Sequence, residues 1–364
     1  MIIAQITQFL ETTAPSFLQE NYDNTGLITG DADWNCTGII ISLDATEEVV
    51  QEAIEKKCNL IVAHHPIIFS GLKKITGRNY VEKTIITAIK NDIAIYAIHT
   101  NLDNMLSGVN AKIADKLGLI NRQILQPKNN TLKKLFTFVP VEHAEKLRSA
   151  IFAAGGGQIS NYSECSFNTP GSGTFKAGEG TNPFAGKMGE RHIEEEIKIE
   201  AIFPAWLQKP IFYAMMAVHP YEEVAYDIVA LDNTNATVGS GLIGELPQPM
   251  AAKDFLQNIK ENFNISVIKH TALTGKPVKK VALCGGAGSF LIGAAIVAGA
   301  DFYISSDIKY HDFFDANGKL VIADIGHYES EQFTIDLLFD ILSEKFTTFA
   351  VLKTGVNTNP VQYF

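Results

Sequence analysis

Three short apolar segments, far apart in the chain, each end in a group of histidine and acidic residues. Apolar runs of this length are typical of strands buried on both faces of a parallel sheet. An open α/β sheet gathers ligands at the carboxyl ends of its strands, so side chains that follow such strands can meet although they are remote in sequence. The segments are residues 61–63, 93–98 and 320–325, and the side chains that follow them include His64, His65, His99, Asp103, His327 and Glu331. The pattern predicts an α/β fold with a metal site where the strands end.

The surroundings of these segments alternate between predicted strands and predicted helices, which is typical of parallel sheets. In the first part of the chain we expect strands at 37–43, 59–65 and 93–98, with helices at 47–57 and 80–91. The last part repeats this plan, with strands at 278–284, 301–305 and 320–325 and a helix of small residues that ends near residue 298. When residues 59–65 are laid over residues 300–306, two histidines align with two serines. We therefore infer an internal duplication, with a cleft between two α/β halves.

The region between the two halves has a different pattern. We expect strands at 133–139, 158–167, 194–203 and 223–230, and helices at 142–154 and 206–217. Strand, helix, strand, twice over, is the ferredoxin-like pattern. The predicted architecture is a ferredoxin-like α+β insertion at residues 129–246, which splits a duplicated α/β parent domain into residues 1–128 and 247–364.

The charge balance limits the partners of the protein. The chain has 30 Lys and Arg residues against 40 Asp and Glu residues, which gives a formal net charge of −10, and no basic block relieves it. This balance disfavours binding to nucleic acid. The chain starts without a basic segment followed by an apolar one, and no apolar run approaches the roughly 20 residues that cross a bilayer, so we expect no membrane segment and a cytoplasmic location.

The spacing of the histidines and acids suits metal binding. His64 and His65 are adjacent, so both can face one site only where the strand ends, and Pro66 favours that break. His327 and Glu331 are four residues apart at a predicted helix start, which places them on one face. Each such side chain alone is more often solvated or paired inside the protein. Together, at the ends of three predicted strands, they favour a metal site, and the carboxylates add the bridging capacity that a centre of two ions needs.

Other candidate residues carry weaker signals. His99 is a candidate for moving protons or for orienting a ligand. The glycine run 285–288 lacks the spacing of a dinucleotide-binding or phosphate-binding loop, which favours close packing of a helix on a strand. Residues 219–223 are explained equally well as a turn before a strand. For His311, contact with a metal ligand, contact with a substrate and a plain surface position all stay open.

Five ordered motifs resemble those of the NIF-three-like dinuclear metal-centre family, whose members are widely catalogued as GTP cyclohydrolase 1 type 2 homologues. The motifs are residues 23–27, 63–66, 99–103, 306–311 and 326–331. The predicted insertion resembles the PII/CutA-like domain of the longer bacterial members. It shares their Gly-Ser-Gly-Thr-Phe stretch (171–175), their Asn-Pro-Phe stretch (182–184) and their His-Pro-Tyr-Glu-Glu turn (219–223). Tyr22 departs from the Trp expected in many members, at a position that is not expected to bind metal.

The resemblance implies two divalent metal ions per chain, and sites of histidine and carboxylate ligands accept Zn, Fe, Mn, Co or Ni. It assigns His65 and Asp103 to one ion and His64 and His327 to the other, with Glu331 bridging both. It also implies a bacterial protein that forms a homohexamer of two trimers, with the metal sites facing an inner cavity.

The family name implies a metal-dependent hydrolase with a nucleotide substrate. In that reaction, water activated by the metals attacks C8 of the guanine of GTP, the ring opens and formate leaves, with His99 or an adjacent acid moving protons. Two alternatives stay open: a metal-dependent phosphoesterase that uses the same centre, and a non-catalytic metal carrier or regulatory scaffold. Release of formate without phosphate separates the first activity from the second, whereas metal transfer without turnover favours the carrier.

Overall fold

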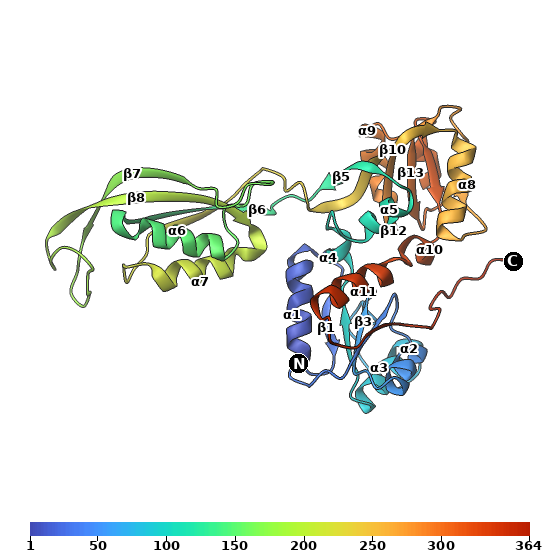
Figure 1. The fold of residues 1–364 in the computed structure, drawn as a ribbon, viewed down its shortest axis with the longest axis horizontal. Helices are drawn as coiled ribbons and strands as arrows, with labels where there is room; N and C mark the ends of the chain where they lie inside the picture. Colours follow the sequence, from blue (N-terminus) through green and yellow to red (C-terminus); the bar gives the residue numbers. More distant parts are fainter. The chain divides into compact units, whose positions relative to one another are not determined.

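The computed structural model describes residues 1–364 and separates into two compact units (Figure 1). The first unit contains residues 1–127 and 236–364, and the second contains residues 128–235. The insertion was expected at residues 129–246, whereas the second unit ends at residue 235. The reason is strand β10 (Gly239–Met250), which pairs with two strands of the first unit and so places its residues in the parent.

The first sheet of the first unit has five strands in the order β1-β4-β3-β2-β15. Strands β2 (Ile39–Ser42), β3 (Leu60–Ala63), β4 (Ala94–Ala97) and β15 (Val351–Lys353) are parallel, and β1 (Gly26–Thr29) is the antiparallel edge strand. Every residue of β2, β3 and β4 is buried, as their unbroken apolar sequences predict. Helices α2 (Glu47–Glu55) and α3 (Tyr80–Lys90) cover one face, and α1 (Ile3–Thr13) and α11 (Thr334–Lys345) cover the other.

The turn between β2 and α2 has a consequence for the site. The side chain of Thr46 accepts a hydrogen bond from the N–H of Val49 and so caps α2. Asp44 is therefore not needed as the cap, and its carboxylate is free to face the end of the neighbouring strand β3.

The second sheet of the first unit has six strands in the order β11-β14-β13-β12-β10-β5. Strands β12 (Val278–Ala287), β13 (Phe302–Ser306) and β14 (Val321–Asp324) are parallel, whereas β5 (Ile120–Pro127), β10 and β11 (Lys269–His270) are antiparallel to their neighbours. Helix α9 (Ile292–Val297) packs on one face, and α5 (Val109–Lys116) and α8 (Ala252–Phe263) pack on the other. The parallel run β14-β13-β12 repeats the order β4-β3-β2, as the inferred duplication predicts.

The two sheets of the first unit share one core. Ile41 and Val62 of the first sheet belong to the same buried cluster as Leu283 and Ile304 of the second. Two short helices, α4 (Thr100–Asp103) and α10 (His327–Glu331), follow the parallel strands β4 and β14. They carry part of the candidate site.

The second unit is a four-stranded antiparallel sheet in the order β7-β8-β6-β9. Its elements are β6 (Leu132–Pro140), α6 (Ala144–Ala153), β7 (Phe167–Lys176), β8 (Arg191–Pro204), α7 (Gln208–Val218) and β9 (Tyr226–Ala230). This is strand, helix, strand, twice over, and both helices pack with the strands in one buried cluster. A closer relation of this unit to PII or CutA proteins stays a prediction.

One expected strand in the second unit is wrong. Residues 158–166 form no strand apart from an isolated bridge between Ile159 and Tyr162, and the pairing with β8 begins at Phe167. The error arose because β7 is rich in glycine and almost entirely exposed, so it lacks the apolar alternation by which strands are predicted. No helix of the structure has the length and apolar character needed to span a membrane.

Candidate metal centre

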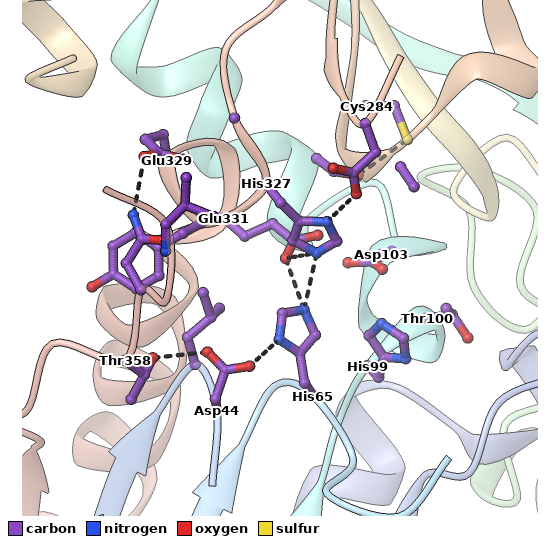
Figure 2. Close-up of a pocket in the computed structure, with 18 of the residues that line it drawn as sticks. Asp44, His65, His99, Thr100, Asp103, Cys284, His327, Glu329, Glu331 and Thr358 are labelled. Atoms are coloured by element: carbon purple, nitrogen blue, oxygen red, sulfur yellow. Dashed lines mark hydrogen bonds and ion pairs between the residues drawn. The ribbon is translucent and has the colours of Figure 1, made fainter. Parts of the chain in front are cut away.

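The ends of three parallel strands deliver the predicted site residues to one place in the first unit (Figure 2). His64 and His65 follow β3, His99 and Asp103 follow β4, and His327 and Glu331 are the first and last residues of α10 after β14. A pocket of about 970 Å³ is lined by all of these side chains except His64, which is fully buried and contacts Asp103 and Glu331. The structure thus brings together every side chain that the sequence pattern singled out for the site.

Each of the four histidines has its Nδ1 atom engaged by an oxygen acceptor. The partners are the carbonyl of Ile98 for His64 (2.8 Å), Asp44 for His65 (2.8 Å), Asp23 for His99 (2.8 Å) and Asp307 for His327 (2.6 Å). Because carbonyl and ionised carboxylate oxygens only accept, Nδ1 carries the proton when the ring is neutral, and the lone pair is then on Nε2. Metal-binding histidines show this arrangement, in which the acceptor behind the ring fixes its tautomer and its orientation.

The Nε2 atoms of three histidines gather around the two carboxylates. Oε2 of Glu331 lies 2.9 Å from Nε2 of His65 and 3.1 Å from Nε2 of His327. Nε2 of His64 lies 3.6 Å from Oδ1 of Asp103 and 3.9 Å from Oε1 of Glu331. The potential ligand atoms therefore form two groups, His65 with His327 and His64 with Asp103, and Glu331 belongs to both. His99 forms a further group with His64 and His65.

Two buried atoms of this cluster have no hydrogen-bond partner, Nε2 of His64 and Oδ1 of Asp103. With its proton on Nδ1, the His64 ring can only accept at Nε2, and Asp103 in the ionised form that binds a metal can only accept as well. Two buried acceptors that face each other without a donor are costly. A cation between them would satisfy both atoms, so the donor set fits a metal ion.

The ionisable groups of the cluster perturb one another strongly. Burial and the neighbouring Glu331 carboxylate raise the pKa of Asp103 well above its usual range, and burial lowers the pKa of His64. Against the effect of burial, hydrogen bonds from the surrounding histidines hold the pKa of Glu331 well below its usual value. Again against burial, hydrogen bonds to carboxylates raise the pKa of His65 to about 10 and that of His327 to about 9. Mutually perturbed groups of this kind cluster at functional sites.

The glycine run of β12 lies against the centre. Gly286 has a positive φ of 64°, and a Cβ atom there would lie 2.3 Å from Oε1 of Glu331. Its N–H donates a hydrogen bond to Ser330 Oγ (3.0 Å) in the same helix as Glu331. The sequence was interpreted as close packing of a helix on a strand, and the structure shows that the close approach is to the helix that carries Glu331.

Sequence reasoning missed the carboxylates that hold the histidines. Asp44 follows β2 and Asp307 follows β13, so both stand at ends of parallel strands, the position used to choose the other candidates. That position is the signal that could have found them. Asp23 was part of a family motif without a role, and it holds His99 through Oδ1 while Oδ2 accepts hydrogen bonds from the N–H (3.0 Å) and the hydroxyl of Thr100.

Two other candidate histidines lie elsewhere. His311 is exposed and contacts the rings of Tyr310 and Phe314, and it does not line the pocket. His219 belongs to the second unit, whereas all the residues of the candidate centre belong to the first.

The pocket around the centre has an aromatic rim and very little positive charge. Five exposed rings line it, those of Tyr22, Phe69, Tyr80, Phe290 and Tyr363. Its one lysine or arginine is Lys269, whose Nζ lies 2.7 Å from Asp324. The C-terminal segment also lines the pocket, and the Thr358 hydroxyl donates a hydrogen bond of 2.8 Å to Oδ2 of Asp44. The surroundings suit a planar group close to the centre.

Residues 1–360 match the family model described as Duf34/NIF3 (NGG1p interacting factor 3). A Halalkalibacterium halodurans protein named GTP cyclohydrolase 1 type 2 homolog is 38% identical over 363 residues, which is 98% of either chain. A Bacillus subtilis protein of the same name is 39% identical, with 89% of this chain and 87% of that one covered. The solved structure of a Bacillus cereus protein related to NIF3 has 38% identity and a TM-score of 0.87, with 100% of this chain and 99% of that chain covered. A solved Staphylococcus aureus protein has 30% identity, a TM-score of 0.79 and the same coverage.

Proposed function

Because the chain belongs to the Duf34/NIF3 family, we propose that its histidine and carboxylate cluster holds two divalent metal ions and that the protein is a metal-dependent hydrolase. The observation that carries this proposal is the common orientation of the four histidine rings. All four have Nδ1 held by an acceptor, and the Nε2 atoms of three of them lie beside the carboxylates of Asp103 and Glu331. A set of solvated side chains would not share one orientation.

The proposed ligands are His64, His65, Asp103, His327 and Glu331. The family resemblance implies that His65 pairs with Asp103 on one ion and His64 with His327 on the other. The contacts support the other grouping, in which His64 lies by Asp103 and His65 lies by His327. Glu331 is the shared ligand in either grouping, since its Oε1 faces one group and its Oε2 faces the other.

Two bound divalent ions would supply positive charge and an activated water molecule for hydrolysis. The chain itself would orient the reactants and move the protons. His99 lines the pocket, and its Nδ1 is fixed by Asp23, so we propose that it exchanges protons with the substrate. Burial of His64 and Glu331 would keep bulk water away from the inner side of the centre.

The name of the relatives suggests GTP as a substrate, with attack at guanine C8 and release of formate. The aromatic rim of the pocket supports a planar base, because base stacking on aromatic rings is favourable. The pocket offers little positive charge for a triphosphate, since Lys269 is already paired with Asp324. The metal ions would therefore provide most of the charge that holds the phosphates.

The test is to measure formate and phosphate release from GTP by protein that has been reconstituted with metal and whose metal content has been counted. Glu331→Ala, which removes the shared ligand, is the blank, and Glu344→Ala on the exposed side of α11 is the matched control. Formate production that is lost only in Glu331→Ala supports the cyclohydrolase reaction. Release of phosphate alone would support a phosphoesterase instead of a cyclohydrolase. If fully loaded protein releases neither product, hydrolysis is contradicted and a metal carrier or scaffold is left.

A further inference from the structure

Three sequence segments that the metal centre does not use come together in the second unit. They are the Gly-Ser-Gly-Thr-Phe stretch (171–175), the Asn-Pro-Phe stretch (182–184) and the His-Pro-Tyr-Glu-Glu turn (219–223). All three contribute residues to one cavity of about 630 Å³. Segments from a strand, a loop and a turn that surround one cavity suggest a binding site.

Two residues of the strand beside the cavity, Gly171 and Gly173, have no side chains and so leave space in it. In the register of β7 with β8, Gly171 lies opposite Glu196. A Cβ atom on Gly173 would lie 2.2 Å from Oε2 of Glu196, so any larger residue at this position would displace the carboxylate. Ile197 and Ile199 of β8 pack against the helices, and the alternation of the strand points Glu196 and Lys198 to the opposite face.

Glu196 is a carboxylate in a largely apolar place. The residue is only 8% exposed, and its Oε1 accepts a hydrogen bond from the Tyr221 hydroxyl (2.7 Å). No hydrogen bond to its Oε2 is present in the structure. Lys198 does not neutralise it, because its Nζ pairs with Glu200 (2.9 Å) and lies over the ring of Phe136. One carboxylate oxygen is thus left for a ligand.

The turn at residues 219–223 fixes the position of the Tyr221 hydroxyl, which donates to Glu196. His219 donates from Nε2 to the carbonyl of Phe138 (3.0 Å) and accepts at Nδ1 from the N–H of Tyr221 (3.1 Å). Burial lowers the pKa of His219, which keeps the ring neutral as this pattern requires. Burial and the Glu196 carboxylate raise the pKa of Tyr221, so its hydroxyl stays a donor.

Aromatic rings form the wall of the cavity. The ring centroid of Tyr221 lies 6.1 Å from that of Phe175 and 6.0 Å from that of Phe184. The loop that carries Phe184 is tied down by a hydrogen bond of 2.9 Å from the N–H of Asn182 to Glu222. Ring faces attract cations, and a buried carboxylate without a full set of partners is stabilised by one.

We propose that this cavity binds a small organic ammonium compound, a primary amine with an apolar body. The ammonium group donates to Oε2 of Glu196 and lies against the rings of Phe175, Phe184 and Tyr221. A neutral ligand would leave the carboxylate uncompensated, and an anion would be repelled by it. The site is independent of the metal centre, whose ligands all belong to the first unit.

The test is isothermal titration calorimetry on the full-length protein, with phenethylammonium chloride as the probe and 2-phenylethanol as its neutral counterpart. We expect saturable binding of the amine with a dissociation constant at or below about 1 mM, and no binding of the alcohol. Glu196→Gln keeps the shape of the side chain but removes its charge, and it should weaken binding of the amine at least about tenfold. Glu195→Gln, the same change on the exposed neighbour, should leave binding unaltered.

A second variant covers the case in which Glu196→Gln does not fold, as judged by circular dichroism and thermal unfolding. Phe184→Leu keeps every charge and removes one ring face, so it should weaken binding of the amine about threefold or more. The proposal is overturned if the wild-type protein shows no saturable binding by about 10 mM amine. It is equally overturned if the alcohol binds as well as the amine, or if Glu195→Gln loses as much affinity as Glu196→Gln.

Discussion

Replacing Asp44 tests whether the carboxylates behind the histidines shape the metal centre. Oδ1 of Asp44 accepts the Nδ1 proton of His65 at 2.8 Å, and Oδ2 accepts the Thr358 hydroxyl at 2.8 Å. In Asp44→Ala the ring of His65 loses the acceptor that fixes its tautomer and its angle. Loss of such a partner typically weakens metal binding 10- to 100-fold, about 1.4 to 2.8 kcal/mol. Because the Asp44 side chain is 35% exposed, water can partly replace it, so we expect the lower half of that range.

The assay is competition for the metal with a coloured chelator, followed by a count of metal per chain. Asp44→Asn keeps an oxygen acceptor without the charge and should lie between Asp44→Ala and the wild type. Asp33→Ala removes an exposed carboxylate from the same unit and should leave the affinity unchanged. The reasoning is refuted if Asp44→Ala binds two ions as tightly as the wild type, or if Asp33→Ala weakens binding to the same extent.

Three further predictions follow from the same geometry. Gly286→Ala places a methyl group on Oε1 of Glu331 at a positive φ, so it should lower the metal count measured by mass spectrometry, whereas Gly293→Ala, in open space on α9, should not. Removal of the metal by a chelator should abolish GTP binding in calorimetry, because the pocket has a single lysine, and binding that survives would contradict this. A chain that joins residue 127 directly to residue 236 should fold and unfold cooperatively by circular dichroism, whereas a junction that also removes β10 should not, since that strand pairs with both β5 and β12.

The candidate ligands could be found from sequence because strand ends converge by a general rule. His64 directly follows a buried parallel strand, and Asp103 and Glu331 are the last residues of the short helices that follow two other buried parallel strands. What the sequence could not show is which carboxylate supports which ring. The sequence does not mark Asp44 as a partner of a histidine, and it meets His65 only because β2 lies beside β3 in the sheet. Which ligands lie together in the centre likewise depends on which strands are neighbours in the sheet.

The parts of the fold that were hardest to predict are those without an apolar pattern. Strand β7 is exposed along most of its length, so it gave no periodic signal, and its neighbouring segment was predicted as the strand instead. Strand β10 begins shortly after the second unit ends, and only its pairing with β5 and β12 shows that it belongs to the parent sheet. The hexamer implied by the family resemblance stays a prediction, because a single chain carries no record of its assembly.

The most direct test of the account is the number of metal ions that each chain binds. Wild-type protein and Glu331→Gln are stripped of metal, incubated with a single divalent metal, freed of excess and analysed by mass spectrometry. The account predicts two ions per wild-type chain and a loss of both high-affinity sites in Glu331→Gln. The reason is that one carboxylate oxygen of Glu331 faces each ligand group in the wild type. Wild-type protein that retains no metal, or a variant that still retains two ions, would contradict a dinuclear centre bridged by Glu331.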